Sequence, residues 1–238
     1  MINIKSTLCL LATAAVFTAC GGGGGSGSRS SATPASSFDA DNYPTYELTQ
    51  DNKDDLAFMG NEERLAYNVY MYLYDYHGDS IDQLYNISTN SETYHINIVR
   101  QLVEKYNITE DDLTILDTNP VASSSTSQDD LPSDKYDIDD IQNLYDYLID
   151  KGKNSTQDAL EVGCMVEVTD INDLNDKIDN AEASGAQDLI DGFNILRDGS
   201  YNHYWAFDNG LKNIGIDDGC CSLGDDYCHP EYPQNTNM

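Results

Sequence analysis

The sequence predicts an all-α protein, a four-helix bundle with a long middle crossover that carries a short extra helix. Three observations predict this fold class. Apolar residues recur three and four positions apart over four long stretches, which is the period of one helix face. Capping residues and glycines stand at the ends of these stretches. Each stretch also carries a Glu or a His in the middle of its apolar face.

The first two helices are expected over residues 51–76 and 80–106. Glu63 lies in the middle of the first apolar face, between Met59 and Ala66. Glu92 and His95 interrupt the second face. Because residues three apart share one side of a helix, the Glu92 carboxylate and the His95 imidazole are expected side by side.

Residues 107–135 form the expected crossover. This stretch has no helical period and is rich in Ser, Asp and Pro, and only a short helical turn is expected, at 110–113. A short helix is expected over 138–151, where Gly152 stops it. The connection between the second and third long helices is therefore long enough to run the length of a bundle.

The third long helix is expected from about 155 to 183, and the fourth from about 186 to 213. On the third helix, Glu167 lies on the apolar face and Asp170 follows one turn later. On the fourth helix, the apolar face carries His203. All four long helices thus bring a metal-ligand type of side chain to the core.

The charge of the chain excludes one class of partner. Its 238 residues include 12 basic and 42 acidic residues, which gives a formal net charge of −30. A polyanion of this kind repels nucleic acid and anionic lipid head groups, so no nucleic-acid partner is expected. Two interpretations of the charge stay open, namely solubility and the concentration of cations near the protein.

Residues 1–19 are expected to be a targeting segment. Lys5 provides a basic start, residues 8–17 are largely apolar, and small residues precede Cys20. The segment resembles a bacterial lipoprotein signal, which implies that Cys20 is lipidated; an ordinary cleaved secretory signal is the alternative. The apolar stretch is too short for a stable membrane span.

Residues 20–45 are expected to be a flexible linker, because they are rich in Gly and Ser and have little apolar surface to bury. The helical domain is expected over 46–214, followed by a polar tail with cysteines over 215–238. A lipid on Cys20 would attach this domain to a membrane without inserting it. The expected location is the bacterial cell envelope, at the outer membrane or on its periplasmic or surface side.

Six ligand-type side chains on the apolar faces require an explanation. A buried carboxylate without a partner costs several kcal/mol. The arginines of these helices, Arg64, Arg100 and Arg197, do not fall on the same faces. Metal ions are the simplest explanation, and mixed carboxylate and imidazole ligands suit iron or manganese. A buried polar network without metal is the alternative. The six candidate metal ligands are Glu63, Glu92, His95, Glu167, Asp170 and His203.

Four runs of sequence resemble the DUF2202 family, a bacterial and archaeal family of uncharacterised ferritin-like domains. They are 63–70, 91–95, 163–171 and 200–207, and the resemblance covers about 56–211. The chain is more distantly similar to rubrerythrin and other di-iron carboxylate proteins. The resemblance implies a ferritin-like bundle, in which the first and third helices each give a Glu and the second and fourth each give a Glu-x-x-His pair.

The resemblance carries over to Glu63, Glu92, His95, Glu167 and His203. One position departs from the pattern, because Ser200 stands where the fourth helix should have a Glu. Asp170 could replace that carboxylate from the neighbouring helix. Glu62 competes with Glu63 for the first position, and Glu63 is preferred because it shares the face of Ala66 and Tyr70. Tyr67, Tyr70, Tyr94 and Tyr204 are candidate hydrogen-bond donors to the ligands.

The resemblance implies a function in which two iron ions, or manganese ions, carry out redox chemistry. The implied reaction class is oxidation of ferrous iron or reduction of peroxide, which would make the protein a di-iron oxidoreductase. No rubredoxin-like Cys-x-x-Cys pair occurs in the sequence. The competing hypothesis is a non-catalytic, acidic helical module of the envelope that binds or sequesters metal. Homo-oligomerisation is left open.

Four cysteines follow Cys20, and an exported protein is expected to form disulfides from them. Two bridges allow three pairings, among which the sequence does not choose. The alternative is a small metal site built from the tail. The four cysteines are Cys164, Cys220, Cys221 and Cys228, and the alternative site would use the last three with His229.

Overall fold

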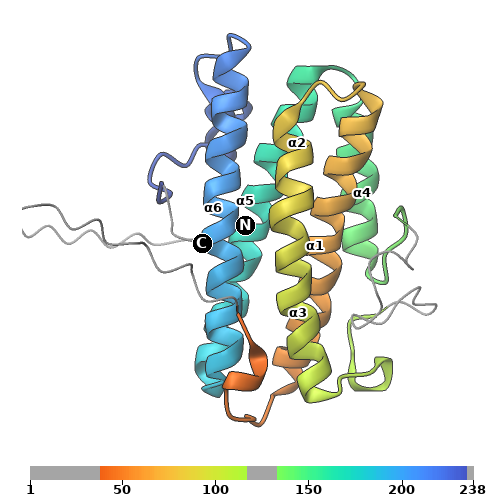
Figure 1. The fold of residues 1–238 in the computed structure, drawn as a ribbon, viewed down its shortest axis with the longest axis vertical. Helices are drawn as coiled ribbons and strands as arrows, with labels where there is room; N and C mark the ends of the chain where they lie inside the picture. Colours follow the sequence, from red (N-terminus) through yellow and green to blue (C-terminus); the bar gives the residue numbers. More distant parts are fainter. Residues whose placement is uncertain (1–37, 117–132, 235–238) are drawn as a thin grey trace, which may run out of the picture. The chain divides into compact units, whose positions relative to one another are not determined.

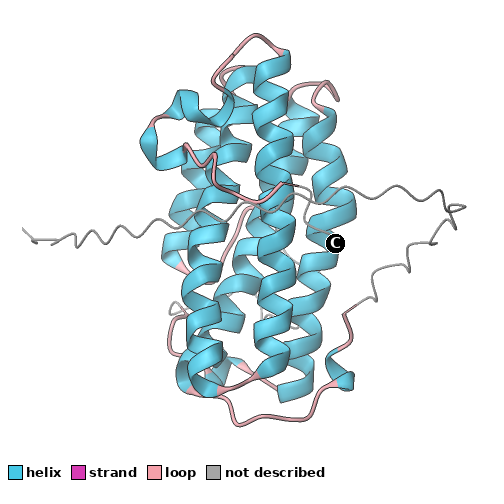
Figure 2. Cartoon of the chain, turned by 90° about the vertical axis from the view of Figure 1, so that its left-hand side faces the viewer, coloured by secondary structure: helices cyan, strands magenta, loops and turns pink. Residues whose placement is uncertain are grey.

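The computed structural model describes residues 38–116 and 133–234, and within these ranges it contains helices and no strands (Figures 1 and 2). The all-α fold class is therefore confirmed. The α-helices are α1 (Gln50–Tyr76), α2 (Asp82–Ile87), α3 (Thr93–Tyr106), α4 (Asp139–Gly152), α5 (Thr156–Ser184) and α6 (Gln187–Asn213). Short helical turns are η1 (Ala40–Asn42), η2 (Ser88–Glu92), η3 (Glu110–Asp112), η5 (Gly219–Leu223) and η6 (Asp225–Tyr227).

The observed helices agree with the expected ranges except within the second. The stretch expected as one helix over 80–106 is α2 and α3 joined by η2, which is a π-helical turn. In this turn the Thr89 hydroxyl donates to the carbonyl of Tyr85 at 2.7 Å, and the Asn90 amide donates to the carbonyl of Asn86 at 2.9 Å. Such side-chain bonds to the preceding turn help a helix to depart from the regular α pattern.

Local sequence explains where the long helices begin and end. The Thr49 side chain accepts from the N–H of Asn52, whose own side chain accepts in return, and this capping box starts α1. Ser155 caps α5 in the same way through the N–H of Asp158. Gly185 ends α5 with φ +74, a left-handed conformation that glycine adopts without strain.

The long helices form a four-membered arrangement in which α1 and α6 are diagonal partners. Helix α1 contacts α3 and α5, and α6 contacts the same two helices (Figure 1). Helix α4, the short helix of the crossover, packs on α1 and α5. None of the described helices is both long enough and apolar enough to cross a membrane.

The packed region begins before the expected domain boundary. Phe38 and Ala40, placed in the linker by the sequence, are buried. The N–H of Phe38 donates to the Tyr94 hydroxyl at 2.9 Å, and the N–H of Ala40 donates to the Gln101 side chain at 3.2 Å. Burial of the Phe38 ring fixes this segment. The expected signal segment 1–19, Cys20 and crossover residues 117–132 lie outside the described residues.

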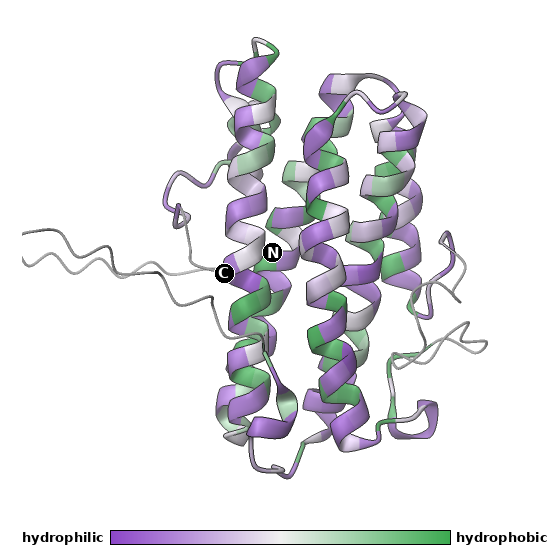
Figure 3. Cartoon of the chain, in the orientation of Figure 1, coloured by the Kyte–Doolittle hydropathy of each residue, from purple (hydrophilic) through white to green (hydrophobic). Residues whose placement is uncertain are grey.

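The buried apolar side chains of the described residues fall into two clusters. The Phe38 cluster includes Leu56, Met59, Ile98, Leu174 and Leu196. The Tyr70 cluster includes Leu65, Ile87, Val168, Tyr204 and Phe207. On each long helix a short stretch between the two clusters carries the polar side chains described below. Figure 3 shows hydrophobic residues recurring along helices whose visible faces are largely hydrophilic.

Close packing of α5 against α6 depends on Gly163. A Cβ atom at this position would lie 2.3 Å from the Phe207 ring, so only glycine permits the contact. The Phe207 ring in turn lies 5.2 Å, centroid to centroid, from the Tyr70 ring. The two helices and Tyr70 are therefore packed as one unit near Glu167.

The tail folds back on the bundle, where one disulfide joins it to α5 and a second closes a loop within it. Cys164 of α5 is bonded to Cys220, and Cys221 is bonded to Cys228. This result selects one of the three pairings. It also corrects the alternative of a tail metal site, because all three cysteines of that site are in disulfides. The fourth group of that site, His229, instead has its Nδ1 2.8 Å from Glu231.

Candidate metal centre

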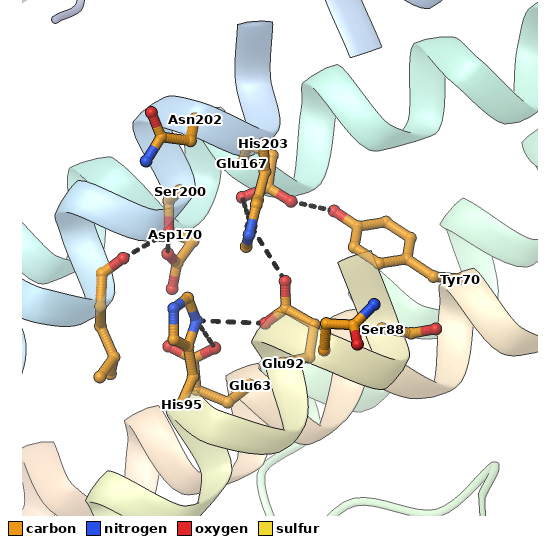
Figure 4. Close-up of polar contacts among 12 residues, drawn as sticks. Glu63, Tyr70, Ser88, Glu92, His95, Glu167, Asp170, Ser200, Asn202 and His203 are labelled. Atoms are coloured by element: carbon orange, nitrogen blue, oxygen red, sulfur yellow. Dashed lines mark hydrogen bonds and ion pairs between the residues drawn. The ribbon is translucent and has the colours of Figure 1, made fainter. Parts of the chain in front are cut away.

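The side chains predicted as metal ligands lie in the polar layer between the Tyr70 and Phe38 clusters (Figure 4). Two groups there bring ligand atoms within 4.8 Å of one another. The first group consists of Glu63, Glu92 and His95, and the second of Glu92, Glu167 and His203. All five residues are buried.

The first group is centred on the His95 ring. Its Nδ1 atom lies 3.1 Å from Oε2 of Glu63 and 3.3 Å from Oε2 of Glu92. Glu63 comes from α1, whereas Glu92 and His95 are one turn apart at the junction of η2 and α3. The expectation that Glu92 and His95 point the same way therefore agrees with their positions.

The second group repeats this arrangement around His203 of α6. The Nδ1 atom of His203 lies 3.1 Å from Oε1 of Glu92 and 3.3 Å from Oε2 of Glu167. The two oxygens of Glu92 thus face different imidazoles, whose ring centroids are 5.5 Å apart. A carboxylate shared in this way is the geometry that bridges two cations in helical bundles.

The remaining predicted ligand, Asp170, lies beside these groups without belonging to either. The Ser200 hydroxyl donates a hydrogen bond to Oδ2 of Asp170. The other carboxylate oxygen of Asp170, Oδ1, is buried and has no hydrogen-bond partner. Asp170 is therefore paired with Ser200 and lies outside both ligand groups.

The choice between Glu62 and Glu63 falls on Glu63. Glu62 is also buried, but it is in neither group. Among the four candidate donor tyrosines, Tyr70 contacts a ligand, since its hydroxyl donates to Oε1 of Glu167. The sequence did not distinguish Tyr70 from the others, because all four lie near ligand positions along their helices.

Mutual interactions shift the ionisation of these groups strongly. Burial opposes protonation of His203, but the carboxylates of Glu167 and Glu92 outweigh it and raise the pKa of His203 to about 10. Burial likewise opposes protonation of His95, but the carboxylates of Glu63 and Glu92 outweigh it and raise the pKa of His95 well above its ordinary value. Burial raises the pKa of Glu63 to about 7 despite its neighbour His95.

Glu92 behaves in the opposite way to the other carboxylates. Burial favours its neutral form, yet His203 and His95 together lower its pKa below the ordinary value. Without metal, protons on the two imidazoles therefore neutralise the carboxylates. A divalent cation would displace these protons, because a coordinating imidazole must be neutral.

The donor set fits metal ions of the iron or manganese class. It combines buried carboxylate oxygens with imidazole nitrogens and contains no thiolate. Within the part of the chain that the structure describes, Oε1 of Glu63 and Oδ1 of Asp170 are buried oxygens without a hydrogen-bond partner. Buried unpaired acceptors of this kind are costly, and a cation would satisfy them.

Comparisons with known proteins place the chain in a family. The model of the family described as "Uncharacterized protein domain (DUF2202)" matches residues 52–224, a range that contains all six predicted ligands. The uncharacterized protein MJ0754 of Methanocaldococcus jannaschii is 32% identical over 172 residues, which are 72% of this chain and 81% of that protein.

A solved structure shows the same relationship. The crystal structure of the hypothetical protein MJ0754 from Methanococcus jannaschii DSM 2661 is similar with a TM-score of 0.60 and 31% identity, covering 73% of this chain and 86% of that one. The family match ends at residue 224 and so includes Cys164 and Cys220, which join the tail to α5. The chain belongs to the DUF2202 family.

Proposed function

We propose that this protein binds two iron ions, with manganese as the alternative, in a carboxylate-bridged centre of a ferritin-like bundle. The observation that carries the proposal is the position of Glu92, whose two oxygens face His95 and His203 in separate ligand groups. Glu63 completes one group and Glu167 the other. Asp170 is an additional carboxylate available to the ion of the group that contains Glu167 and His203.

The proposed reaction class is oxidation of ferrous iron or reduction of peroxide. Two iron ions held by these residues would supply one electron each, which is the number of electrons needed to convert one hydrogen peroxide and two protons into two water molecules. The protein residues position the ions, and Tyr70 orients Glu167 through its hydroxyl. The two apolar clusters on either side of the polar layer keep bulk water from the ends of the site.

We place this activity at the bacterial cell envelope, with the domain attached to a membrane through a lipid on Cys20. The two disulfides support an oxidising location, since such bonds persist mainly in exported proteins. Metal ions and the membrane are the proposed partners, and association of several copies is compatible with the proposal.

The net charge of −30 favours a second candidate, sequestration of metal without catalysis. An acidic surface raises the local concentration of cations whether or not a reaction follows. Both candidate functions use the same metal centre, but only the oxidoreductase would convert a substrate repeatedly. Loaded protein that consumes peroxide over many cycles with a supplied reductant supports the oxidoreductase, whereas stoichiometric binding alone supports sequestration.

Elemental analysis tests the centre directly. Protein purified without chelators and reconstituted anaerobically with Fe²⁺ should hold about two ions per chain, because Glu92 serves both positions. Glu92→Gln should lose both ions, whereas His203→Ala should lose mainly the ion of the group formed by Glu92, Glu167 and His203. Glu161→Gln is the matched control, since Glu161 is a buried α5 carboxylate that pairs with Lys151 outside the polar layer.

The proposal fails if wild-type protein retains less than about half an equivalent of iron or manganese after reconstitution. It also fails if Glu92→Gln binds as much metal as the Glu161→Gln control. Circular dichroism of each variant checks that the bundle is folded, so that a loss of metal is not read from unfolded protein.

A further inference from the structure

A row of carboxylates leads from the candidate centre along the contact between α1 and α5, and two of its members, Glu62 and Asp173, belong to neither ligand group. It consists of Asp170, Glu62 and Asp173. Asp170 is 5% exposed and Glu62 is 2% exposed, whereas Asp173 is partly exposed. The row therefore begins next to the centre and ends at the protein surface.

Each carboxylate in the row interacts with the next. Asp170 and Asp173 are one turn apart on α5 and share a face of that helix, and Glu62 of α1 interacts with Asp173 across the helix contact. Glu62 also interacts with Asp170, and Asp170 interacts with Glu63 and Glu167. The row is thus continuous from Asp173 to the ligand groups.

The inner members of the row carry oxygens that nothing in the described chain satisfies. Oε2 of Glu62, Oδ1 of Asp170 and Oε1 of Glu63 are buried and have no hydrogen-bond partner. The nearby Lys177 does not neutralise them, because its Nζ lies 3.4 Å from Asp55 and over the ring of Phe58. Buried, unpaired carboxylate oxygens in succession are suited to a cation that passes between them.

Among the residues that the structure describes, apolar side chains close the polar layer towards both ends of the bundle. The Tyr70 cluster covers the centre on one side along the helix axes, and the Phe38 cluster covers it on the other. An ion must therefore reach the polar layer from the side, between helices. The contact of α1 with α5 is lined there by acidic oxygens from both helices.

We propose that Asp173, Glu62 and Asp170 form the entry route by which a divalent cation reaches the metal centre. This inference rests on the proposed function. Oxygen ligands without imidazole bind such an ion weakly, which allows it to move on to the stronger mixed site. Asp173 collects the ion at the surface, Glu62 takes it into the core and Asp170 passes it to Glu63 and Glu167.

Stopped-flow uptake of Co²⁺ tests the route, because the visible absorbance of Co²⁺ changes when protein ligands replace water. Glu62→Gln and Asp173→Asn should each slow the appearance of the bound spectrum about tenfold, as expected when a charged path is interrupted. The final number of ions per chain should stay at the wild-type value. Asp176→Asn is the matched control, since it removes the same charge from an exposed position one turn further along α5.

Each outcome decides a point. Wild-type rates for both variants, or equal slowing by Asp176→Asn, overturn the route and leave the proposed function intact. A lower final stoichiometry for Glu62→Gln also overturns it, because Glu62 would then be a ligand of the centre. If wild-type protein takes up no Co²⁺, Fe²⁺ or Mn²⁺, the proposed function itself fails and the route with it. Asp173→Asn, at a partly exposed position, provides the test if Glu62→Gln does not fold.

Discussion

Glu92 is the residue on which the candidate site depends, since it is the only member of both ligand groups found in the described ranges. The pKa of Glu92 is lowered because the imidazoles of His95 and His203 face it. In return, the Glu92 carboxylate raises the pKa of both imidazoles. The same pair of contacts that stabilises protons in the metal-free protein presents two oxygens and two nitrogens to cations. Around this unit, Tyr70 and Ser200 each fix a carboxylate by a hydrogen bond.

Replacing Tyr70 by Phe tests the importance of these supporting bonds. Loss of the hydroxyl leaves Oε1 of Glu167 without its donor, so Glu167 is less well oriented for the second position. Metal affinity should fall by about 10-fold to 100-fold, as is usual when a group that orients a ligand is removed. Competition between the protein and a calibrated chelator for Mn²⁺ measures the change.

Tyr204→Phe is the control for this substitution. Tyr204 is equally buried, but its hydroxyl donates to the carbonyl of Tyr227 in the tail at 3.0 Å. Its removal should affect stability and leave metal affinity unchanged. Equal metal affinities for the Tyr70→Phe variant and wild type would contradict the role assigned to Tyr70.

Five of the six side chains predicted as ligands lie in the two groups, whereas their supporting contacts could not be predicted from the sequence. Glu63, Glu92, His95, Glu167 and His203 could be found because helical periodicity fixes which side of a helix a residue occupies. The hydrogen bond from Ser200 to Asp170 could not, because it depends on the distance between two helices. The same reason explains why Tyr70 could not be separated from three other tyrosines.

At the scale of the element, η2 is the feature that periodicity does not reveal. A π-helical turn contains an additional residue relative to an α-helix, so it changes the backbone geometry within the turn. Glu92 is the last residue of this turn, and α3 then carries His95 inward. The expected regular helix over 80–106 has the correct length, yet it omits the turn that sets the direction of Glu92.

Deletion of Asn90 tests the function of the π turn. Asn90 is exposed, so its removal takes no apolar contact from the core. The shorter segment should form a regular α-helix in which α3 keeps its rotation relative to α2, while the backbone at Glu92 loses the π-helical geometry that directs its carboxylate. Helicity measured by circular dichroism should be nearly unchanged, whereas bound iron should fall to a small fraction of the wild-type amount.

An Asn90→Ala substitution keeps the residue count and serves as the comparison. It should retain the metal, because the register of the helix is preserved. A deletion variant with normal metal content would show that the π turn has no part in positioning the site.

At the scale of the whole domain, the Cys164–Cys220 disulfide holds the tail against α5, and the Cys221–Cys228 disulfide closes a loop within the tail. The sequence allowed three pairings, and choosing between them requires knowing that Cys164 faces the tail, which is a tertiary property. The packing of Phe38 and Ala40 on the bundle is not predicted for a similar reason. The composition of 20–45 indicates a linker, but one buried aromatic ring near its end is enough to attach it to the bundle.

The two bridges should contribute unequally to stability. Cys164 and Cys220 are 56 positions apart in sequence, whereas Cys221 and Cys228 are 7 apart. Because a longer loop loses more entropy when closed, removing the first bridge by a double Cys→Ala substitution should lower the free energy of unfolding by about 4 kcal/mol, and removing the second by about 2.5 kcal/mol. Urea unfolding of the two variants measures the difference.

Metal content provides the second readout for these variants. The Cys164 bridge lies one turn from Glu167 along α5, yet neither cysteine contacts a ligand in the described structure. Both variants should therefore keep their metal below the unfolding transition. A larger loss of stability on removing the short loop would contradict the entropic account.

The polar layer between the Phe38 and Tyr70 clusters also affects how the bundle responds to a shortage of metal. Apolar contacts join the four helices above and below this layer, but within it the helices are joined through ionisable groups. If the centre is loaded as proposed, the ions connect the two halves into one cooperative unit. Without metal, the bundle would be least stable at the polar layer, and proteases would cleave it there first. The abundance of the protein would then follow the metal supply of the cell.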